Sequence, residues 1–497
     1  MIGMAQVSLK LRLRLLVAEM RVSINRFERG RGFDIRLRGR DEAAQSHVPL
    51  ENPFMHRLFR GAVMAALIGA APAAAVAASA GPFDAPSPLL LHAPRFDKIK
   101  DGDFQPAFEV AMARERAEIE AIADNPAAPT FDNTFLAMER SGRMLNRVVS
   151  VFFALTGANT DEALEKVEAE EAPKLSALRD ETYLNPKLFA RVKALYDERE
   201  RLGLDAESVQ LIKITYDDFV HAGAKLSAKD RAELTDINSR LASLQTAFQQ
   251  KLLAATKAGA LVVDNPAALA GLSPAELAAA AQAAKARGLD GKWVIPLQNT
   301  TQQPDLRSLA ERATRKTLFD HSWTRAEKGD ANDTRSTILE IVRLRARKAA
   351  LIGYPDFAAY KLEDQMAKTP AAVEAFVRQL VGPARARAAV EAAEIQAQID
   401  KDGGGFTLAP WDWERYSEEV RKAKYDLDEN EIKPYFELYN VLENGVFYAA
   451  NQLYGVTFKE RHDLPVYQPD VKVFEVFDQD GKTLGLIYFD YFKRDNK

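Results

Sequence analysis

Residues 104–122 read FQPAFEVAMARERAEIEAI, and this stretch shows the pattern that decides the fold. Its large apolar side chains recur at steps of three, four and seven residues: Phe104, Phe108, Met112, Ile119 and Ile122. This spacing gathers them in one stripe along an α-helix and leaves polar residues on the remaining faces. The stretch therefore predicts an amphipathic helix.

Helix-start signals recur along the chain. Ser227 and Asp230 stand in a capping-box relation at the start of a long helical stretch, 227–257. Ser273-Pro274-Ala275-Glu276 combines an N-cap, a proline at the first helical position and a glutamate at N3. Thr369-Pro370 opens another helix. These signals predict a succession of helices.

Extended segments are few. Residues 261–263 and 293–297 interrupt the helical pattern. Near the end, 471–476 alternates between apolar and polar residues, 478–481 forms a turn, and 484–492 is apolar and aromatic, which predicts a β-hairpin. We expect this hairpin to have nothing that covers or pairs it. The predicted fold class is mainly α, with a small β-hairpin near the C-terminus.

The composition excludes several kinds of chemistry. The chain has 497 residues, 47% hydrophobic and 28% charged, as in ordinary globular proteins. It has no cysteine, which excludes disulfides, thiolate metal ligands and cysteine nucleophiles. No two of its six histidines stand four residues apart, so no helix offers two imidazoles to one metal ion. They are His47, His56, His92, His221, His321 and His462.

The segment 55–80, MHRLFRGAVMAALIGAAPAAAVAASA, has the layout of a secretory signal peptide. Arg57 and Arg60 precede an eleven-residue apolar core, and small residues end at Ala80. An uncleaved anchor is the alternative, but this alanine-rich stretch makes a weak membrane span. We therefore expect cleavage before Gly81, with no stable membrane anchor left, and a periplasmic or secreted mature chain.

Charge is unevenly distributed along the chain. Residues 1–54 carry ten Lys and Arg against six Asp and Glu, a net charge of +4, and we expect them to be an over-extended start, basic and poorly ordered. Residues 81–497 carry 55 basic against 65 acidic residues, a net charge of −10. This acidic body argues against a nucleic-acid partner.

Several motifs resemble functional sites, but the neighbouring residues argue against that interpretation. Asp426, Asp428, Asn430 and Glu437 fit positions 1, 3, 5 and 12 of a calcium loop, but the sixth position is not the required glycine. The glycines 403–405 lack the lysine that would follow in a phosphate-binding loop. A loop followed by a helix cap is the better interpretation of the first motif, and a flexible loop between helices is the better interpretation of the second.

Two further sets concern histidine and arginine. Asp320-His321-Ser322 invites a triad interpretation, but a triad is a spatial arrangement that adjacent residues rarely form. Glu460 and His462 are more typical of a charged surface. The basic run, Arg343, Arg345, Arg347 and Lys348, spreads around a helix and suggests a solvated face or salt bridges between helices. No catalytic residue, cofactor-binding residue or metal ligand is assigned from these patterns.

The segment 406–497 contains a series of ordered motifs. They are Ala409-Pro410-Trp411-Asp412-Trp413, Lys433-Pro434-Tyr435-Phe436-Glu437-Leu438, Asn444-Gly445-Val446-Phe447, Val466-Tyr467-Gln468-Pro469-Asp470-Val471 and Tyr488-Phe489-Asp490-Tyr491-Phe492-Lys493-Arg494. Together they resemble the thimet oligopeptidase family of zinc peptidases, especially its bacterial peptidyl-dipeptidase (dipeptidyl carboxypeptidase) branch. The resemblance spans roughly residue 89 to the end. Gln468 departs from it, because the family usually carries histidine there.

The resemblance implies a two-lobed, largely helical peptidase with a channel that admits short unstructured peptides. Residues 81–400 would form the helical N-terminal lobe, and 401–497 the beginning of the catalytic region. Family chemistry uses H-E-x-x-H and a further glutamate to hold Zn²⁺, and the motif glutamate acts as general base on the bound water.

No His-Glu dipeptide occurs in the chain. The family's zinc helix follows the step that corresponds to Arg494-Asp495-Asn496-Lys497, so we expect an N-terminal fragment that is inactive alone. A complementary C-terminal chain could complete the site if the enzyme is split. The alternative is a non-catalytic peptide-binding or interaction protein derived from the same scaffold.

Overall fold

A computed structural model describes residues 79–298, 302–426 and 429–497. The expected start region, 1–54, and the expected signal peptide up to residue 78 lie outside the described residues. The residues from Ala78 onward form one unit, which is the subject of the description below. Within the described ranges, no helix is long and apolar enough to cross a membrane.

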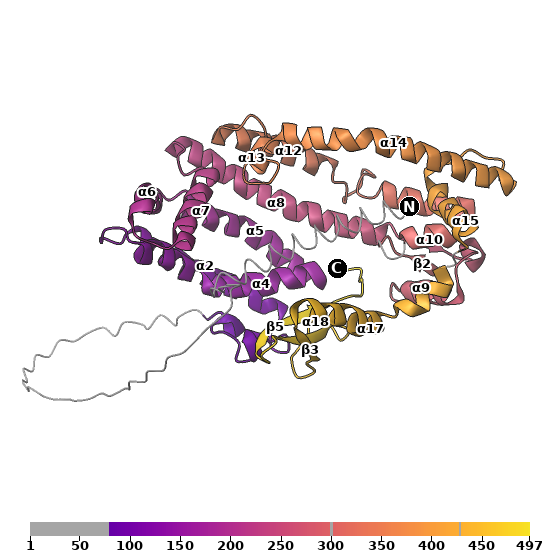
Figure 1. The fold of residues 1–497 in the computed structure, drawn as a ribbon, viewed down its shortest axis with the longest axis horizontal. Helices are drawn as coiled ribbons and strands as arrows, with labels where there is room; N and C mark the ends of the chain where they lie inside the picture. Colours follow the sequence, from indigo (N-terminus) through magenta and orange to yellow (C-terminus); the bar gives the residue numbers. More distant parts are fainter. Residues whose placement is uncertain (1–78, 299–301, 427–428) are drawn as a thin grey trace, which may run out of the picture. The chain divides into compact units, whose positions relative to one another are not determined.

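Helices make up most of the described chain (Figure 1), which confirms the predicted fold class. The α-helices are α2 (Phe104–Ala123), α3 (Ala137–Arg140), α4 (Arg143–Ala158), α5 (Glu162–Tyr183), α6 (Pro186–Glu198), α7 (Ala206–Ala222), α8 (Ala228–Ala258), α9 (Pro274–Lys285), α10 (Gln302–Ser308), α11 (Arg312–Trp323), α12 (Arg335–Ile352), α13 (Phe357–Leu362), α14 (Pro370–Lys401), α15 (Trp413–Tyr425), α16 (Glu429–Ile432), α17 (Leu438–Val441) and α18 (Tyr448–Tyr454). The strands are β1 (Leu261–Val263), β2 (Trp293–Ile295), β3 (Thr457–Glu460), β4 (Lys472–Phe477) and β5 (Thr483–Phe489).

The helix-start signals act as predicted, with one difference. At α9 the capping box is complete, because the Glu276 amide donates to Ser273 Oγ and the Ser273 amide donates to Glu276 Oε2. At α14 the Ala372 amide donates to Thr369 Oγ1 (3.2 Å). At α8 the Asp230 amide donates to Ser227 Oγ, but the Asp230 carboxylate binds the Ser227 hydroxyl. Ser227 is therefore an N-cap there without a complete capping box.

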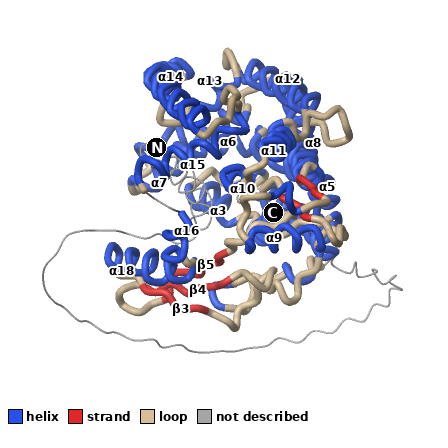
Figure 2. The backbone as a smooth tube through the Cα atoms, turned by 90° about the vertical axis from the view of Figure 1, so that its right-hand side faces the viewer, coloured by secondary structure: helices blue, strands red, loops and turns tan. Residues whose placement is uncertain are grey.

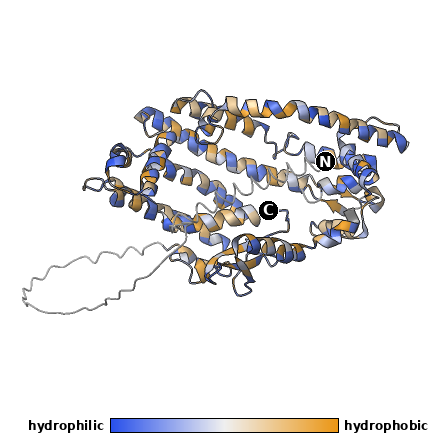
Figure 3. Cartoon of the chain, viewed as in Figure 1, coloured by the Kyte–Doolittle hydropathy of each residue, from blue (hydrophilic) through white to orange (hydrophobic). Residues whose placement is uncertain are grey.

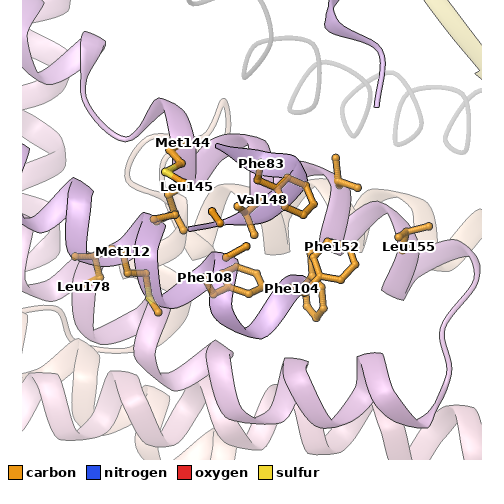
Figure 4. Packing of buried hydrophobic residues seen from close by; sticks show 14 of the residues in the cluster. Phe83, Phe104, Phe108, Met112, Met144, Leu145, Val148, Phe152, Leu155 and Leu178 are labelled. Atoms are coloured by element: carbon orange, nitrogen blue, oxygen red, sulfur yellow. The ribbon is translucent and has the colours of Figure 1, made fainter. Parts of the chain in front are cut away.

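The first part of the predicted stripe of α2, Phe104, Phe108 and Met112, lies in a core that α2 shares with α4 (Figure 4). Ile119 and Ile122 lie in a second core, with residues of α6 and α7. Phe104, Phe108 and Phe152 are fully buried, and the Phe152 ring centroid lies 5.1 Å from each of the other two. Both pairs meet edge to face, the geometry that the aromatic quadrupole favours. Met112 of α2 and Leu178 of α5 extend the same core. The spacing in the sequence therefore identified a real buried face.

The strands form two small antiparallel sheets, and the C-terminal sheet is drawn red in Figure 2. β1 pairs with β2, and the second sheet has the order β3-β4-β5. The hairpin β4–β5 was predicted, whereas β3 was not. The expectation that nothing covers or pairs the hairpin is wrong for β4: β3 pairs with it along Thr457–Glu460, and Val473 and Phe474 are buried.

Asp412 is a fully buried carboxylate that joins distant parts of the chain. Arg312 donates to it through Nε and Nη2, at 2.8 to 3.1 Å, and the buried Arg315 donates at 3.1 Å. Arg315 also donates to the carbonyls of Leu309 and Ala310 after α10. A charge without water is stable only with such partners. The segment that follows α14 is thereby held on α11.

The predicted boundary between 81–400 and 401–497 falls at the C-terminal end of α14, Pro370–Lys401. Gly403 and Gly405 follow it with positive φ angles of 72° and 61°. These conformations suit glycine and form the inter-helix loop that the sequence predicts. The domain boundary itself stays a prediction.

We expect Phe152→Ala to lower the free energy of unfolding by about 3–5 kcal/mol, because it opens a cavity between α2 and α4. Urea denaturation followed by circular dichroism measures the change. The control is Phe376→Ala on α14, where the side chain is 62% exposed and the cost should stay within about 0.5 kcal/mol. Equal costs for the two variants would contradict the assignment of Phe152 to the core.

Candidate functional site

The segment after β5 is held to the end of α4 by one guanidinium. Arg494 donates through Nη2 to the carbonyl of Ala158, the last residue of α4, at 2.9 Å and to Asp490 Oδ2 at 2.6 Å. Its Nη1 lies 3.2 Å from Asp470. The last carbonyls of a helix have no partner within the helix, so an arginine there satisfies one of them.

A second set of hydrogen bonds continues this attachment along the loop between α4 and α5. The Thr160 amide donates to the Asn496 carbonyl (3.1 Å), and Asn496 Nδ2 donates to the Thr160 carbonyl (2.9 Å). Gln468 Nε2 donates to Asn159 Oδ1 (2.5 Å), so the residue that departs from the family pattern also lies in this contact. The C-terminal segment is thus fixed to the helices through side chains and backbone.

Asp490 lies at the centre of these contacts and is largely buried. Burial by itself would raise the pKa of this carboxyl, but hydrogen bonds from Arg494, Lys497 and Tyr467 outweigh burial and lower the pKa below its ordinary value. The Tyr467 hydroxyl donates to Asp490 Oδ2 at 2.8 Å. Burial and this carboxylate together raise the pKa of Tyr467. Asp490 is therefore held as a carboxylate and Tyr467 as a neutral hydroxyl.

A cavity of about 340 Å³ lies where this segment meets the end of α8. Its charged lining residues are Lys257, Arg325, Lys493, Arg494, Asp495 and Lys497. Asp495 is paired with Arg287 at 2.6 Å and accepts from Gln298 at 3.1 Å. Burial lowers the pKa of Lys493, and the nearby Lys497 and Arg494 add to this effect. The excess of cations favours anions such as carboxylates.

This cavity can bind a negative group, but its lining carries no set of groups for hydrolysis. None of its lining side chains is a histidine, serine or glutamate, and its threonine is Thr256. Thr256 Oγ1 donates to the Leu252 carbonyl within α8 (2.7 Å), so its hydroxyl is engaged. A nucleophile paired with a base is therefore absent from this lining.

The triad interpretation of Asp320-His321-Ser322 finds no support in the geometry. His321 Nδ1 faces the carbonyl of Gly259 (3.1 Å), and Asp320 pairs with Lys316 one turn earlier on α11. The side chains of Asp320 and His321 thus make separate contacts. His462 is 82% exposed with its Nδ1 3.9 Å from Glu460, as expected for a charged surface.

Only some residues of the possible calcium loop lie within the described chain. Asp428 lies outside the described residues. Asp426 ends α15 with a positive φ of 47°, and Glu437 caps α17 by accepting from the Asn440 amide at 2.7 Å. The hypothesis stays untested, although Glu437 already has the capping role that the sequence suggested as an alternative.

In the basic run on α12, Arg347 forms a salt bridge between helices of the kind that the sequence predicted. Arg347 pairs with Glu233 of α8 at 2.5 Å. Lys348 Nζ donates to Asn238 of α8 at 2.7 Å, and Asn238 Nδ2 donates to Asp180 of α5 at 2.9 Å. Burial lowers the pKa of Lys348 and raises the pKa of Asp180. The sequence identified the cations but not this buried chain across three helices, because no local spacing connects α5, α8 and α12.

The described residues do not fit a zinc ion. No group of three or more His, Asp or Glu side chains within the described ranges could hold a metal. His221, for example, has its Nδ1 2.9 Å from Glu363 and stacks on Tyr360 with 4.0 Å between ring centroids. One imidazole with one carboxylate falls short of the three protein ligands of a catalytic zinc site.

Comparison with known proteins decides the family. Residues 306–497 match the sequence profile described as Peptidase family M3. The chain is 53% identical to the dipeptidyl carboxypeptidase of Escherichia coli (strain K12) over 416 residues, which is 84% of this chain and 61% of that protein. The chain thus carries a peptidase family M3 domain at residues 306–497. It spans about three fifths of the length of the curated relatives it matches.

Other relatives of this M3 chain agree. The dipeptidyl carboxypeptidase of Salmonella typhimurium is 52% identical over 411 residues, 83% of this chain and 60% of that protein. The oligopeptidase A of E. coli is 28% identical over 417 residues, 83% of this chain and 61% of that protein. The resemblance to the thimet oligopeptidase family that the sequence motifs indicated is thus confirmed. Metallopeptidases of this family are in general zinc-dependent.

We expect Asp490→Asn to lower the free energy of unfolding at pH 7 by about 1.5–3 kcal/mol, because Arg494 and Lys497 lose a charged partner. The pKa of Asp490 in the folded chain lies below its unfolded value of about 3.9. The contribution of Asp490 to the free energy of unfolding is therefore complete above the unfolded pKa. It is lost as the pH falls through the pKa of the folded chain. Denaturant titrations between pH 7 and pH 3 should show the difference between variant and parent narrowing below about pH 4.

The matched control is Asp290→Asn, because Asp290 is an exposed aspartate in the turn before β2. This variant should stay within about 0.5 kcal/mol of the parent throughout. If Asp490→Asn behaved like this control, the attachment of the C-terminal segment through Asp490 would be wrong.

Proposed function

We propose that this chain provides the helical scaffold of a zinc-dependent peptidyl-dipeptidase, which releases dipeptides from the C-terminus of short unstructured peptides. The identity of 53% with the E. coli dipeptidyl carboxypeptidase carries this proposal. That identity is about twice the 28% shared with oligopeptidase A over a segment of similar length. The comparison therefore favours the peptidyl-dipeptidase branch within the family.

The catalytic groups of such an enzyme are not among the 497 residues, since the chain has no His-Glu dipeptide. A bound zinc ion would supply a Lewis acid and lower the pKa of a bound water. The described side chains do not assemble ligands for it. We propose that the chain is inactive alone and that polypeptide outside these residues supplies the ligands and the general base.

Purified chain should contain far less than one zinc per molecule and should release no dipeptide from an unstructured peptide with a free C-terminus. Metal analysis by mass spectrometry and chromatography of the products measure both. The E. coli dipeptidyl carboxypeptidase, handled in parallel, is the positive control. Stoichiometric zinc together with dipeptide release would refute the proposed inactivity.

A peptide-binding measurement separates the alternative of a non-catalytic peptide-binding protein. A scaffold that needs its catalytic part should bind a labelled peptide weakly, because one side of the channel is missing. Tight and saturable binding by the chain alone would favour the alternative. The net charge of −10 over 81–497 supports peptides over nucleic acid as partners.

We propose further that the mature chain is periplasmic or secreted, on the basis of the segment 55–80. The mature chain would begin at Gly81. This residue opens a 3₁₀ turn, and Phe83 in that turn is buried in the core shared by α2 and α4. N-terminal sequencing of chain recovered from the periplasm or the medium should give a first residue at or near Gly81. Recovery only from the cytoplasm, with residues 55–80 attached, would overturn the proposal.

A further inference from the structure

The N-terminal half of α14 is uncovered. Every residue from 371 to 387 is exposed in the part of the chain that the structure describes. The buried residues of α14 are Ile395 and Ile399, near its other end. Lys424 of α15 pairs with Glu394 at 2.7 Å in this second half. In Figure 1 the helix accordingly forms the upper edge of the ribbon, with α13 near one end and α15 near the other.

This uncovered half carries an apolar stripe. Val373, Phe376, Val377 and Leu380 follow the i, i+3, i+4, i+7 spacing of one helical face, and Val381 flanks them. Phe376 is 62% exposed and Leu380 54% exposed. Figure 3 shows apolar and polar residues alternating along this helix. The stripe of α2 has the same kind of spacing but is buried, so α14 presents a core-type face without a core.

The helix has limited means of its own to stay folded. Thr369 caps its start, and Arg378 and Glu374 form an ion pair one turn apart. Against these, Gly382-Pro383 lies within the helix, where proline removes one hydrogen bond and glycine adds flexibility. Most helices in proteins owe their stability to packing of an apolar face. We therefore expect another polypeptide to pack on this stripe and stabilise the helix.

The family comparison indicates which partner. α14 lies wholly inside the 306–497 match to peptidase family M3. The relatives that share this region at 52–53% identity contain further polypeptide, because the match covers only 60–61% of their length. This chain and its longer relatives share the region of α14. In the relatives, the additional polypeptide would cover the apolar stripe if it packs on this helix.

We propose that the apolar stripe of α14, residues Val373, Phe376, Val377, Leu380 and Val381, is the docking site for the catalytic polypeptide that completes the enzyme. The inference rests on the proposed function and names the surface on which the two parts meet. The partner segment is expected to present an apolar face of its own, such as an amphipathic helix laid along α14. Burial of Phe376 and Leu380 would then supply much of the binding free energy.

Hydrogen–deuterium exchange tests the proposal on two proteins. One is this full chain alone, and the other is a chimera that joins it after Lys497 to the segment of the E. coli dipeptidyl carboxypeptidase that follows the match. Amides of residues 373–381 should exchange at least about tenfold more slowly in the chimera. Amides of α2 and α4 should be protected equally in both proteins and report that each is folded.

Two variants of the chimera locate the contact. Phe376→Glu places a charge in the stripe and should make exchange at 373–381 about tenfold faster or more. Ala375→Glu introduces the same charge on the opposite face of the same helix, where Ala375 is exposed, and should leave the exchange unchanged. Equal effects of the two variants would overturn the proposal, as would equal exchange in the chimera and the chain alone.

The intact E. coli enzyme gives an independent measurement if the chimera fails to fold. Its helix aligned with α14 should be protected as strongly as its own core, and an unprotected helix would overturn the inference. If the chimera binds zinc and releases dipeptides while 373–381 stays unprotected, the docking site is wrong but the proposed function stands. If 373–381 is protected but no zinc binds, the proposed function fails and the docking site stands. Self-association of the chain that Phe376→Glu abolishes, without protection in the chimera, would assign the face to a second copy and overturn the proposal.

Discussion

The buried carboxylate of Asp412 closes an excursion of about a hundred residues, from α11 through α12, α13 and α14 and back to α11. Two guanidiniums meet it there, and Arg315 also binds the carbonyls at the end of α10. Removal of the Asp412 carboxylate would leave the buried guanidinium of Arg315 without its charged partner, which is far more costly than the pair itself is stabilising. The return of the chain from α14 to α11 therefore depends on this contact.

A second polar contact complements the first at the other end of the family match. Arg494 joins the C-terminal sheet to the end of α4 through Ala158, and Asp490 balances its charge. The Asp412 and Arg494 contacts each hold a later segment of the chain on an earlier helix through polar groups. The apolar core lies elsewhere, between α2 and α4. The cation-lined cavity lies beside the second attachment, so the geometry that holds the sheet also sets the charge of the cavity.

Local signals explain which parts of this structure the sequence could predict. The stripe that contains Phe108 and the caps at Ser273 and Thr369 depend on neighbours within a few residues, and each gave the observed helix. β3 was missed because its sequence, TFKE, contains a single apolar residue, whereas the shorter β1 and β2 read LVV and WVI. The pairing of Asp412 with Arg312 spans a hundred residues, and no spacing rule connects them. The absence of a His-Glu dipeptide is a property of the sequence itself, whereas the cavity depends on distant segments that only folding brings together.

The exposed stripe of α14 also has a consequence for the amount of the chain in a cell. Chaperones and quality-control proteases recognise uncovered apolar segments, and marginally stable regions are the ones they act on. A chain that presents Phe376 and Leu380 to water is a substrate for such surveillance until something covers them. Its abundance would then follow the supply of the covering polypeptide, so that surplus copies are removed and neither part accumulates alone.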